Sequence, residues 1–252
     1  MSAEPSRNHY SYSHYADPAT AKTFDRRRFS GPIGEMIAGT QARVLANFVG
    51  RIHDRPILDV GTGTGRAALL LSRGGAHVTG LDASEQMLAI ARKRAADEGA
   101  NIRFMVGDVH AIDFPDRSFD VAVCLRVLMH SPKWRLCVAE LCRVADRLVI
   151  VDYPAKRSVA RIESAWRGVL HAIGMKTEPY RTFTHAEIDE AFTRAGFRVR
   201  STHRQFVLPI AFHKLLHSRR TTVFIEDLLD RMGLLKLFGS PVTLVAERCV
   251  IS

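Results

Sequence analysis

The sequence predicts an α/β fold built from strand–helix–strand units around one hydrophobic core. An apolar, strand-like segment at 57–60 runs into a glycine-rich turn, and a helix-forming segment at 66–71 follows at once. Further apolar segments of strand length alternate with helical ones along the chain. With 252 residues, 46% of them hydrophobic, the chain can bury a full core. We therefore expect a tail and helical segment at 1–55 and one main domain at 56–252.

The turn after the first strand (56–60) has glycine at every second position, namely Gly61, Gly63 and Gly65. Glycine lets the backbone turn sharply and approach a ligand without a Cβ in the way. The helix that follows offers unpaired N–H groups to polar ligand atoms. Dinucleotide-binding turns need a glycine where this chain has Arg66. The spacing, with Asp59 inside the strand end, therefore favours a different nucleotide ligand.

A second acidic residue, Asp82, ends the strand predicted at 77–81. It stands 19 positions after Gly63, close to the offset of about 20 residues at which a carboxylate reaches a ribose diol. A carboxylate can accept a hydrogen bond from both hydroxyl groups of the ribose. Ser84 is the expected N-cap of the next helix, with Met87 near the bound base. In the alternative interpretation, Asp82 only caps this helix.

Four segments in order carry a family resemblance. They are 59–65, 80–88, Gly107-Asp108-Val109 after a strand at 102–106, and 113–120 before a strand at 121–125. Together they resemble the motifs of the class I S-adenosylmethionine (SAM)-dependent methyltransferases, in the small-molecule branch of the ubiquinone and menaquinone biosynthesis enzymes. The resemblance implies a Rossmann-like, seven-stranded sheet, mostly parallel with its last strand antiparallel, and with helices on both faces.

The resemblance also implies a set of residues that bind SAM and its product S-adenosylhomocysteine (SAH), with no metal ion. The glycine turn and Asp59 would hold the amino-acid end of SAM, Asp82 the ribose and Asp108 the adenine amino group. Val109 would supply a backbone N–H, and Leu125 and Arg126 would border the methionine part. The full predicted set is Asp59, Gly61, Thr62, Gly63, Gly65, Asp82, Ala83, Met87, Gly107, Asp108, Val109, Leu125 and Arg126.

The segment after the fourth strand, 126–132, bears on the acceptor. It lacks the Asn/Asp-Pro-Pro-Tyr/Phe sequence of enzymes that methylate planar amino groups, which counts against that chemistry. His130 is the candidate catalytic residue, because the pKa of an unperturbed imidazole suits proton removal near neutrality. The competing interpretation, a histidine that only holds the loop by hydrogen bonds, is the favoured one.

Other elements are predicted from periodicity and capping signals. A helix at 33–49 could be a lid over the cofactor or a cover for a sheet edge, with Tyr15 and Arg26 to Arg28 before it. Thr184 and Glu187 form a capping box. The remaining elements are helices at 132–145 and 156–174 and strands at 147–151, 197–206 and 241–250. On the strand at 197–206, Arg198, Arg200, Thr202 and Arg204 are expected to share one face.

Two insertions, at about 155–178 and 209–240, are expected to help form the acceptor site. The second is strongly apolar at helical spacing, so it could instead mediate a homodimer. A membrane-surface helix is a further option, disfavoured here by the acidic residues Glu226, Asp227 and Asp230.

The charge distribution and the cysteine content limit the binding partners and the cellular location that the sequence predicts. The net charge of +10 lies outside 56–155, where 12 basic residues balance 12 acidic ones. Basic flanks make a nucleic-acid partner an option, but solvated arginines explain them as well, and a small-molecule acceptor is favoured. Four cysteines without a metal-like pattern, and no signal or membrane-spanning sequence, predict reduced thiols and a cytoplasmic location. The competing functions are an RNA or protein methyltransferase that uses the basic flanks, and a SAM-binding protein without activity.

Overall fold

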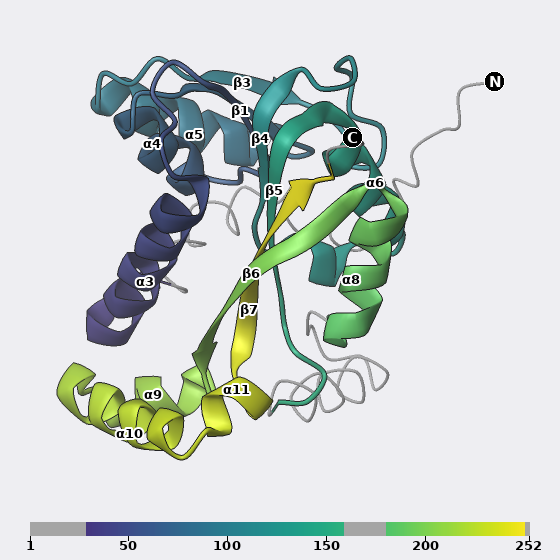
Figure 1. Ribbon diagram of the computed structural model, residues 1–252. Helices are drawn as coiled ribbons and strands as arrows, with labels where there is room; N and C mark the ends of the chain where they lie inside the picture. The colour runs from purple at the N-terminus through teal and green to yellow at the C-terminus, as the bar shows by residue number, and fades with distance from the viewer. Residues whose placement is uncertain (1–28, 159–179, 250–252) are drawn as a thin grey trace, which may run out of the picture.

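The computed structural model describes residues 29–158 and 180–249 of the chain. Its centre is a seven-stranded sheet in the order β3-β2-β1-β4-β5-β7-β6 (Figure 1). The pairing is parallel from β3 to β5, and β7 runs antiparallel to both β5 and β6. The strands are β1 (Pro56–Val60), β2 (His77–Asp82), β3 (Arg103–Val106), β4 (Phe119–Cys124), β5 (Ala145–Tyr153), β6 (Phe197–Phe206) and β7 (Ser240–Arg248). The predicted sheet, including its antiparallel last strand, is confirmed.

Helices cover both faces of the sheet, as predicted (Figure 1). On one face, α3 (Gly31–Val49) and α4 (Arg66–Arg73) pack against a core that includes Ile57 of β1. On the other, α6 (Trp134–Val144) and α8 (His185–Arg194) pack against a core that includes Leu58. The two core faces follow from the alternation of side chains along a strand. The helix α5 (Glu85–Asp97) lies against β2 and β3.

The predicted capping signals position two of these helices. The Ser84 hydroxyl accepts a hydrogen bond from the backbone N–H of Met87 at 3.2 Å, which starts α5 directly after the tip of β2. Thr184 and Glu187 form both bonds of a capping box at the start of α8. The first cap matters for function, because it holds Asp82 between a strand end and a helix start.

The insertion between β6 and β7 is helical, as predicted. It consists of α9 (Ile210–Leu216), α10 (Arg219–Arg231) and α11 (Leu234–Phe238), which lie together at one end of the molecule (Figure 1). Both α9 and α10 contact α3. Ile37 of α3 and Phe206 at the end of β6 belong to one small core cluster there. The insertion therefore rests on the helix that also borders the main cavity.

The prediction that four polar residues share one face of β6 is wrong. The register shifts between Val199 and Ser201, so that Arg200 is an extra residue in the edge strand. Arg198 pairs with Glu247 and Arg204 with Val242, positions of β7 that differ by an odd number. Their side chains therefore lie on opposite faces of the sheet, because successive side chains alternate.

Some predictions fall on residues outside the described ranges. These are the tail with Tyr15 and Arg26 to Arg28, and most of the helix at 156–174. Among the described helices, none is both long and apolar enough to cross a lipid bilayer. Cys124, Cys137 and Cys142 are buried, as predicted for most of the cysteines, and Cys249 is exposed.

Candidate active site

The glycine turn after β1 has a backbone conformation that favours glycine at three positions. Gly61, Gly63 and Gly65 all have φ between 55° and 79°, in the left-handed region. A Cβ on Gly61 would lie 2.2 Å from Cγ2 of Val127. At Gly63 the nearest such atom is 4.0 Å away. The turn is therefore pressed against the loop after β4 at Gly61, and leaves open space for another molecule at Gly63.

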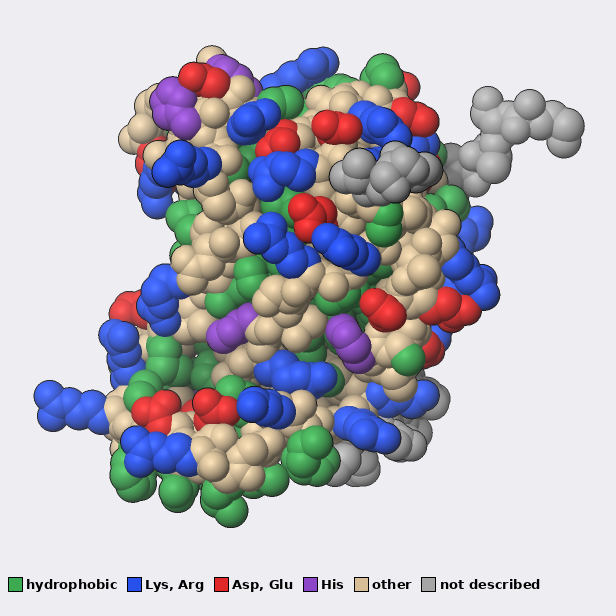
Figure 2. All heavy atoms as spheres, viewed as in Figure 1, with side chains coloured by type: hydrophobic (Ala, Val, Ile, Leu, Met, Phe, Trp, Pro, Cys, Tyr) green, Lys and Arg blue, Asp and Glu red, His purple; other side chains and the backbone are tan. Residues whose placement is uncertain are grey.

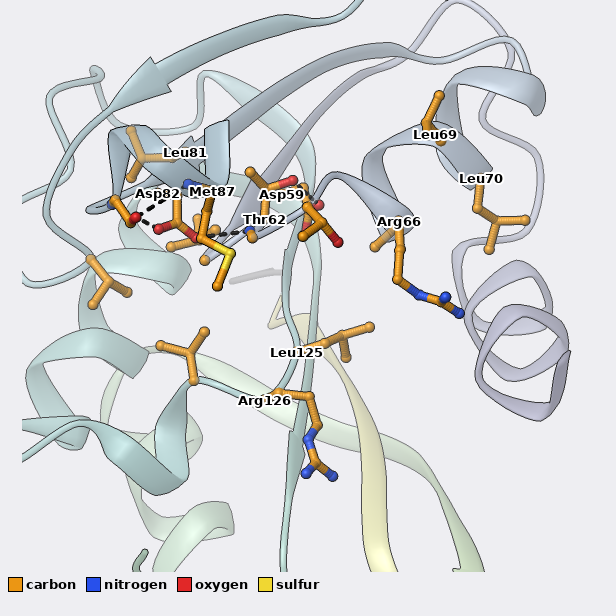
Figure 3. Close-up of a pocket in the computed structure, with 18 of the residues that line it drawn as sticks. Asp59, Thr62, Arg66, Leu69, Leu70, Leu81, Asp82, Met87, Leu125 and Arg126 are labelled. Carbon is orange, nitrogen blue, oxygen red and sulfur yellow. Dashed lines mark hydrogen bonds between the residues drawn. The ribbon is translucent and has the colours of Figure 1, made fainter. Parts of the chain in front are cut away.

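Asp82 stands at the tip of β2 with its carboxylate facing this turn. One oxygen accepts the backbone N–H of Gly63 at 2.8 Å, and the other accepts that of Ser84 at 2.9 Å. Burial raises the pKa of the carboxyl group, and these hydrogen bonds oppose the rise. Each carboxylate oxygen has further lone pairs, so both can accept another hydrogen bond. Figure 3 shows Asp82 beside Thr62 and Met87 on one wall of the pocket.

Asp59 is the more deeply buried acid, only 2% exposed, and it also borders the cavity. Its Oδ2 accepts a hydrogen bond from the Thr62 hydroxyl at 2.6 Å. Burial raises the pKa of Asp59 to about 6, and the negative charge of Asp82 adds to this rise. A cationic group bound beside it would favour the ionised form. The site thus holds two carboxylates whose ionisation is costly unless a ligand compensates.

The wall formed by the tips of β2 and β3 is mostly apolar. Ala83, Met87, Gly107 and Val109 all line the cavity. A Cβ on Gly107 would lie 2.4 Å from Cδ1 of Leu81, so a side chain there would have to displace a buried leucine. Flat apolar groups such as an adenine ring suit this kind of wall.

Asp108 makes contacts that the sequence does not reveal. Its Oδ1 accepts the backbone N–H of His110 at 2.9 Å and lies 2.8 Å from Nδ1 of the same residue. Nε2 of His110 lies 2.7 Å from the Ser131 hydroxyl. His110 and Ser131 line the cavity. This carboxylate–imidazole–hydroxyl chain ties the loop after β3 to the loop after β4. Sequence analysis missed it because His110 and Ser131 stand 21 residues apart.

The loop after β4 is held by a further acid that sequence analysis also missed. Arg126 has φ 65°, unusual for a residue with a side chain. Its backbone N–H donates to the carboxylate of Asp152, which is 3% exposed at the end of β5. Leu125 and Arg126 both line the cavity (Figure 3). The available signal was positional, because Asp152 lies within the last two residues of a buried strand, as Asp59 and Asp82 do.

His130 closes a short 3-10 turn, Leu128–His130, and lines the same cavity. Its side chain is 8% exposed, and its backbone N–H donates to the Val127 carbonyl at 2.8 Å. It is therefore close enough to the cavity to meet a ligand and buried enough to support the loop. Both interpretations of His130 fit this position.

The opposite wall comes from the N-terminal helix. Ala38, Gln41, Ala42 and Leu45 of α3 line the cavity. The guanidinium group of Arg66 lies 3.8 Å from the centre of the Phe29 ring, which joins the start of α4 to the segment before α3. Leu45 also packs into the core under the sheet. The helix at 31–49 thus both covers the sheet and borders the cavity.

The cavity enclosed by these walls has a volume of about 480 Å³. Such a volume lies in the range of small-molecule and cofactor sites, about 300–1,000 Å³. The residues that line the cavity suit SAM. Carboxylates border one end of the cavity, an apolar wall borders the other end, and the turn at Gly63 is open. Of the predicted cofactor residues, all except Gly65 and Asp108 line this cavity. Among the described residues, no group of three His, Cys, Asp or Glu side chains is placed to hold a metal ion.

Comparisons with known proteins agree with this geometry. Residues 57–147 match a family model described as a methyltransferase domain. A demethylmenaquinone methyltransferase of Thermotoga maritima is 33% identical over 171 residues, which cover 59% of this chain and 72% of that protein. The chain belongs to the SAM-dependent methyltransferase family.

Two further relatives match this methyltransferase over shorter stretches. A demethylmenaquinone methyltransferase of Thermus thermophilus is 39% identical over 103 residues, covering 39% of this chain and 47% of its own. A ubiquinone biosynthesis O-methyltransferase of Aeromonas salmonicida is 36% identical over 85 residues, covering 33% and 35%. The chain thus spans about half the length, or less, of several curated relatives that it matches.

The solved structures agree on the fold. The magnesium protoporphyrin IX methyltransferase of Synechocystis, crystallised with SAH, superposes with a TM-score of 0.68. The match covers 95% of this methyltransferase and 99% of that chain at 20% identity. A likeness at this identity concerns the arrangement of the elements alone.

Proposed function

We propose that this methyltransferase transfers the methyl group of SAM to an oxygen, carbon or nitrogen atom of a small, partly apolar acceptor. The observation that carries the proposal is the pair of buried carboxylates, Asp59 and Asp82, at neighbouring strand tips beside the open turn at Gly63. The names of the relatives, which refer to demethylmenaquinone and to ubiquinone biosynthesis, support an acceptor of this apolar kind.

Each part of SAM has a proposed partner on the walls of the cavity. The ribose hydroxyls would donate to the Asp82 oxygens, which already accept one backbone N–H each. The positive amino group would lie at the Asp59 end, where it would offset the cost of the buried charge. Thr62 and the glycine turn, including Gly65 behind it, would shape this end of the site.

The adenine would lie between Met87 and Ala83 on one side and the Gly107 turn on the other. Its ring edge would meet the Val109 backbone and the Asp108 carboxylate. Asp108 already hydrogen-bonds His110, so its contact with adenine must be compatible with those bonds. We propose that Asp108 meets the adenine amino group while His110 fixes its orientation.

The chain's own contribution to methyl transfer is positioning and the exclusion of water. SAM supplies a methyl group that a positive sulfonium already activates for in-line displacement. Leu125 and Arg126 would border the methionine part, and the loop at 126–131 would hold the acceptor atom on the far side of the methyl group. Because alignment of the reacting atoms lowers the barrier substantially, the rigid contacts of this loop matter more than acid–base groups.

His130 is the proposed general base for an acceptor that must lose a proton. If it acts so, His130→Ala lowers kcat by about 10²-fold or more, a range typical of general bases, and leaves SAM affinity unchanged. Turnover and calorimetric SAM titration of the same sample measure the two quantities. Equal turnover in the variant would assign the side chain to loop support only.

The direct test is transfer of a radioactive methyl group from SAM. We expect label in a small-molecule or lipid extract of cells incubated with the protein, and calorimetric binding of SAM and SAH to the protein alone. Label in RNA or in protein would support the alternative function, and a steep loss of RNA affinity with salt would support it independently. Binding without transfer to any extract would leave a SAM-binding protein, and absence of binding would refute the proposal.

A further inference from the structure

The helix α10 buries polar residues most deeply and leaves several large apolar residues exposed, which is unusual for a surface helix. Its buried residues are polar, namely Thr222 at 0% and Glu226 at 8% exposed. Three of its apolar residues face solvent, with Val223 at 42%, Phe224 at 70% and Leu228 at 50% exposed, whereas Ile225 and Leu229 are half-buried. A surface helix normally buries its apolar stripe, so this orientation needs a physical cause.

The cause is a hydrogen-bonded carboxylate beneath the helix. The oxygens of Glu226 accept the backbone N–H groups of Val207 at 2.8 Å and Leu208 at 3.0 Å, just after β6. Its Oε1 also lies 2.8 Å from Nε2 of His213, a fully buried residue of α9. Because a buried carboxylate without such bonds is costly, Glu226 fixes the rotation of α10 about its own axis. Phe224 and Leu228 are thereby held in solvent.

The exposed apolar surface extends over all three helices of the insertion. Of the ten large hydrophobic residues exposed in the described parts of the chain, eight lie in this segment. We call them the apolar patch: Phe212, Leu215, Val223, Phe224, Leu228, Met232, Leu237 and Phe238. Figure 2 shows hydrophobic side chains gathered at this end of the molecule. Apolar surface concentrated in this way marks an interaction site, whereas scattered exposed residues do not.

Positive charge accompanies the patch. Its three helices and the turns between them carry Lys214, Arg219, Arg220, Arg231 and Lys236, against the exposed acids Asp227 and Asp230. Glu226, the third acid, is turned inward and occupied by its three donors. The structure thus removes one of the acidic residues that argue against a membrane-surface helix in the sequence.

We propose that the apolar patch docks onto the surface of a bilayer that contains anionic phospholipid. Phe, Leu and Met side chains would enter the boundary between headgroups and acyl chains, and the Lys and Arg side chains would meet the lipid phosphates. A second copy of the chain suits the patch less well. A two-fold interface sets the same surface against itself, so the excess positive charge of one copy would face that of the other.

Vesicle binding by the full chain tests this proposal. In sedimentation experiments, we expect the protein to bind vesicles of phosphatidylcholine mixed with phosphatidylglycerol, and to bind pure phosphatidylcholine much less. The double variant Phe224→Ser/Leu228→Ser should abolish binding to the mixed vesicles. Arg219→Glu/Arg220→Glu should weaken it at least about tenfold, since each basic residue near an anionic surface contributes on the order of 1 kcal/mol.

Matched controls separate the patch from general effects. Arg51→Glu/Arg55→Glu makes the same change in net charge at exposed positions before β1. Leu136→Ser removes an exposed apolar residue from α6, where it is 43% exposed. Both controls should bind vesicles like the natural chain, and all variants should keep its thermal unfolding midpoint.

Three outcomes would overturn the proposal. The first is absence of binding to either kind of vesicle. The second is an equal loss in the Arg51→Glu/Arg55→Glu control, which would reveal attraction by net charge alone. The third is a natural chain that light scattering finds dimeric and that Phe224→Ser/Leu228→Ser makes monomeric, without vesicle binding. That result would assign the patch to a second copy of the chain.

Discussion

Two regions of this methyltransferase use the same device for different ends. At the tip of β2, Asp82 accepts two backbone N–H groups and faces a cavity. Under α10, Glu226 also accepts two backbone N–H groups, but His213 is its third partner. Asp82 is held in place and still has lone pairs that face a cavity, so it is suited to bind a ligand. Glu226 is surrounded by hydrogen-bond donors of the protein itself, so it is suited to anchor a helix.

The largest expected effect is on the anchor. Glu226→Ala leaves two backbone N–H groups and His213 without their acceptor, which should cost about 3–5 kcal/mol of local stability. Amide hydrogen exchange should then accelerate at Val207, Leu208 and along α10, while β1 and β4 stay protected. Asp227→Ala, next to it but exposed, is the matched control and should change little. Unaltered exchange in Glu226→Ala would mean that other contacts hold the helix.

The next largest effect is expected at Asp59, where one substitution should raise the stability of the fold and weaken SAM binding. Its pKa of about 6 in the folded protein lies above the ordinary value of 3.8. The folded state therefore holds a proton that the unfolded state releases, and the free energy of unfolding falls as pH rises from about 4 to 6. Above that range, the buried charge costs about 3 kcal/mol at roughly 1.4 kcal/mol per pKa unit.

Asp59→Asn should remove this cost. We expect the variant to be more stable than the natural chain at pH 7 and similar to it near pH 4, and to bind SAM more weakly. Urea unfolding at several pH values, with calorimetry at pH 7, measures both effects. A variant with the same pH dependence as the natural chain would contradict the assignment of the raised pKa.

A substitution of Asp82 is expected to change SAM affinity alone. Asp82→Ala is expected to weaken SAM affinity by one to two orders of magnitude, about 1.5–3 kcal/mol for lost hydrogen bonds to a charged group. Asp113→Ala, an exposed acid in the loop before β4, is the control. Calorimetry that finds equal affinity for Asp82→Ala and the natural chain would remove Asp82 from the ribose role.

The smallest effect is expected in the apolar patch. Phe224→Ser should change the free energy of unfolding by less than about 0.5 kcal/mol, because the ring is 70% exposed. Phe183→Ser, at a position 1% exposed against Trp134 and Tyr153, should cost about 3–5 kcal/mol. Chemical denaturation compares the two. A large loss for Phe224→Ser would mean that the patch packs within the chain.

The placement of Asp59, Asp82 and the glycine turn at strand ends could be predicted because their signals are local. Their roles toward SAM stay predictions. Asp59 and Asp82 each end an apolar strand, the glycines between them have fixed spacing, and Ser84 begins the next helix. The contacts that escaped prediction join distant segments. His110 meets Ser131, and Arg126 meets Asp152, only after the strands have assembled.

In the insertion between β6 and β7, the sequence predicted the helices but not the face that each helix buries. Its apolar periodicity correctly predicted helices, but periodicity assigns the apolar face to the interior. The rotation of α10 depends on Glu226 and on donors at 207, 208 and 213, which lie outside the helix. The bulge at Arg200 escaped prediction for a similar reason, because only the pairing with β7 reveals it.

The contact between Gly61 and Val127 has a consequence for how this site can diversify. A γ-methyl group of Val127 fills the place of the side chain that Gly61 lacks. The loop that would grip the methyl donor and the loop that would face the acceptor therefore share one steric boundary. An evolutionary change of acceptor that enlarges residue 127 would press on the donor loop. We therefore expect changes of acceptor specificity to occur at neighbouring positions that do not contact the glycine turn.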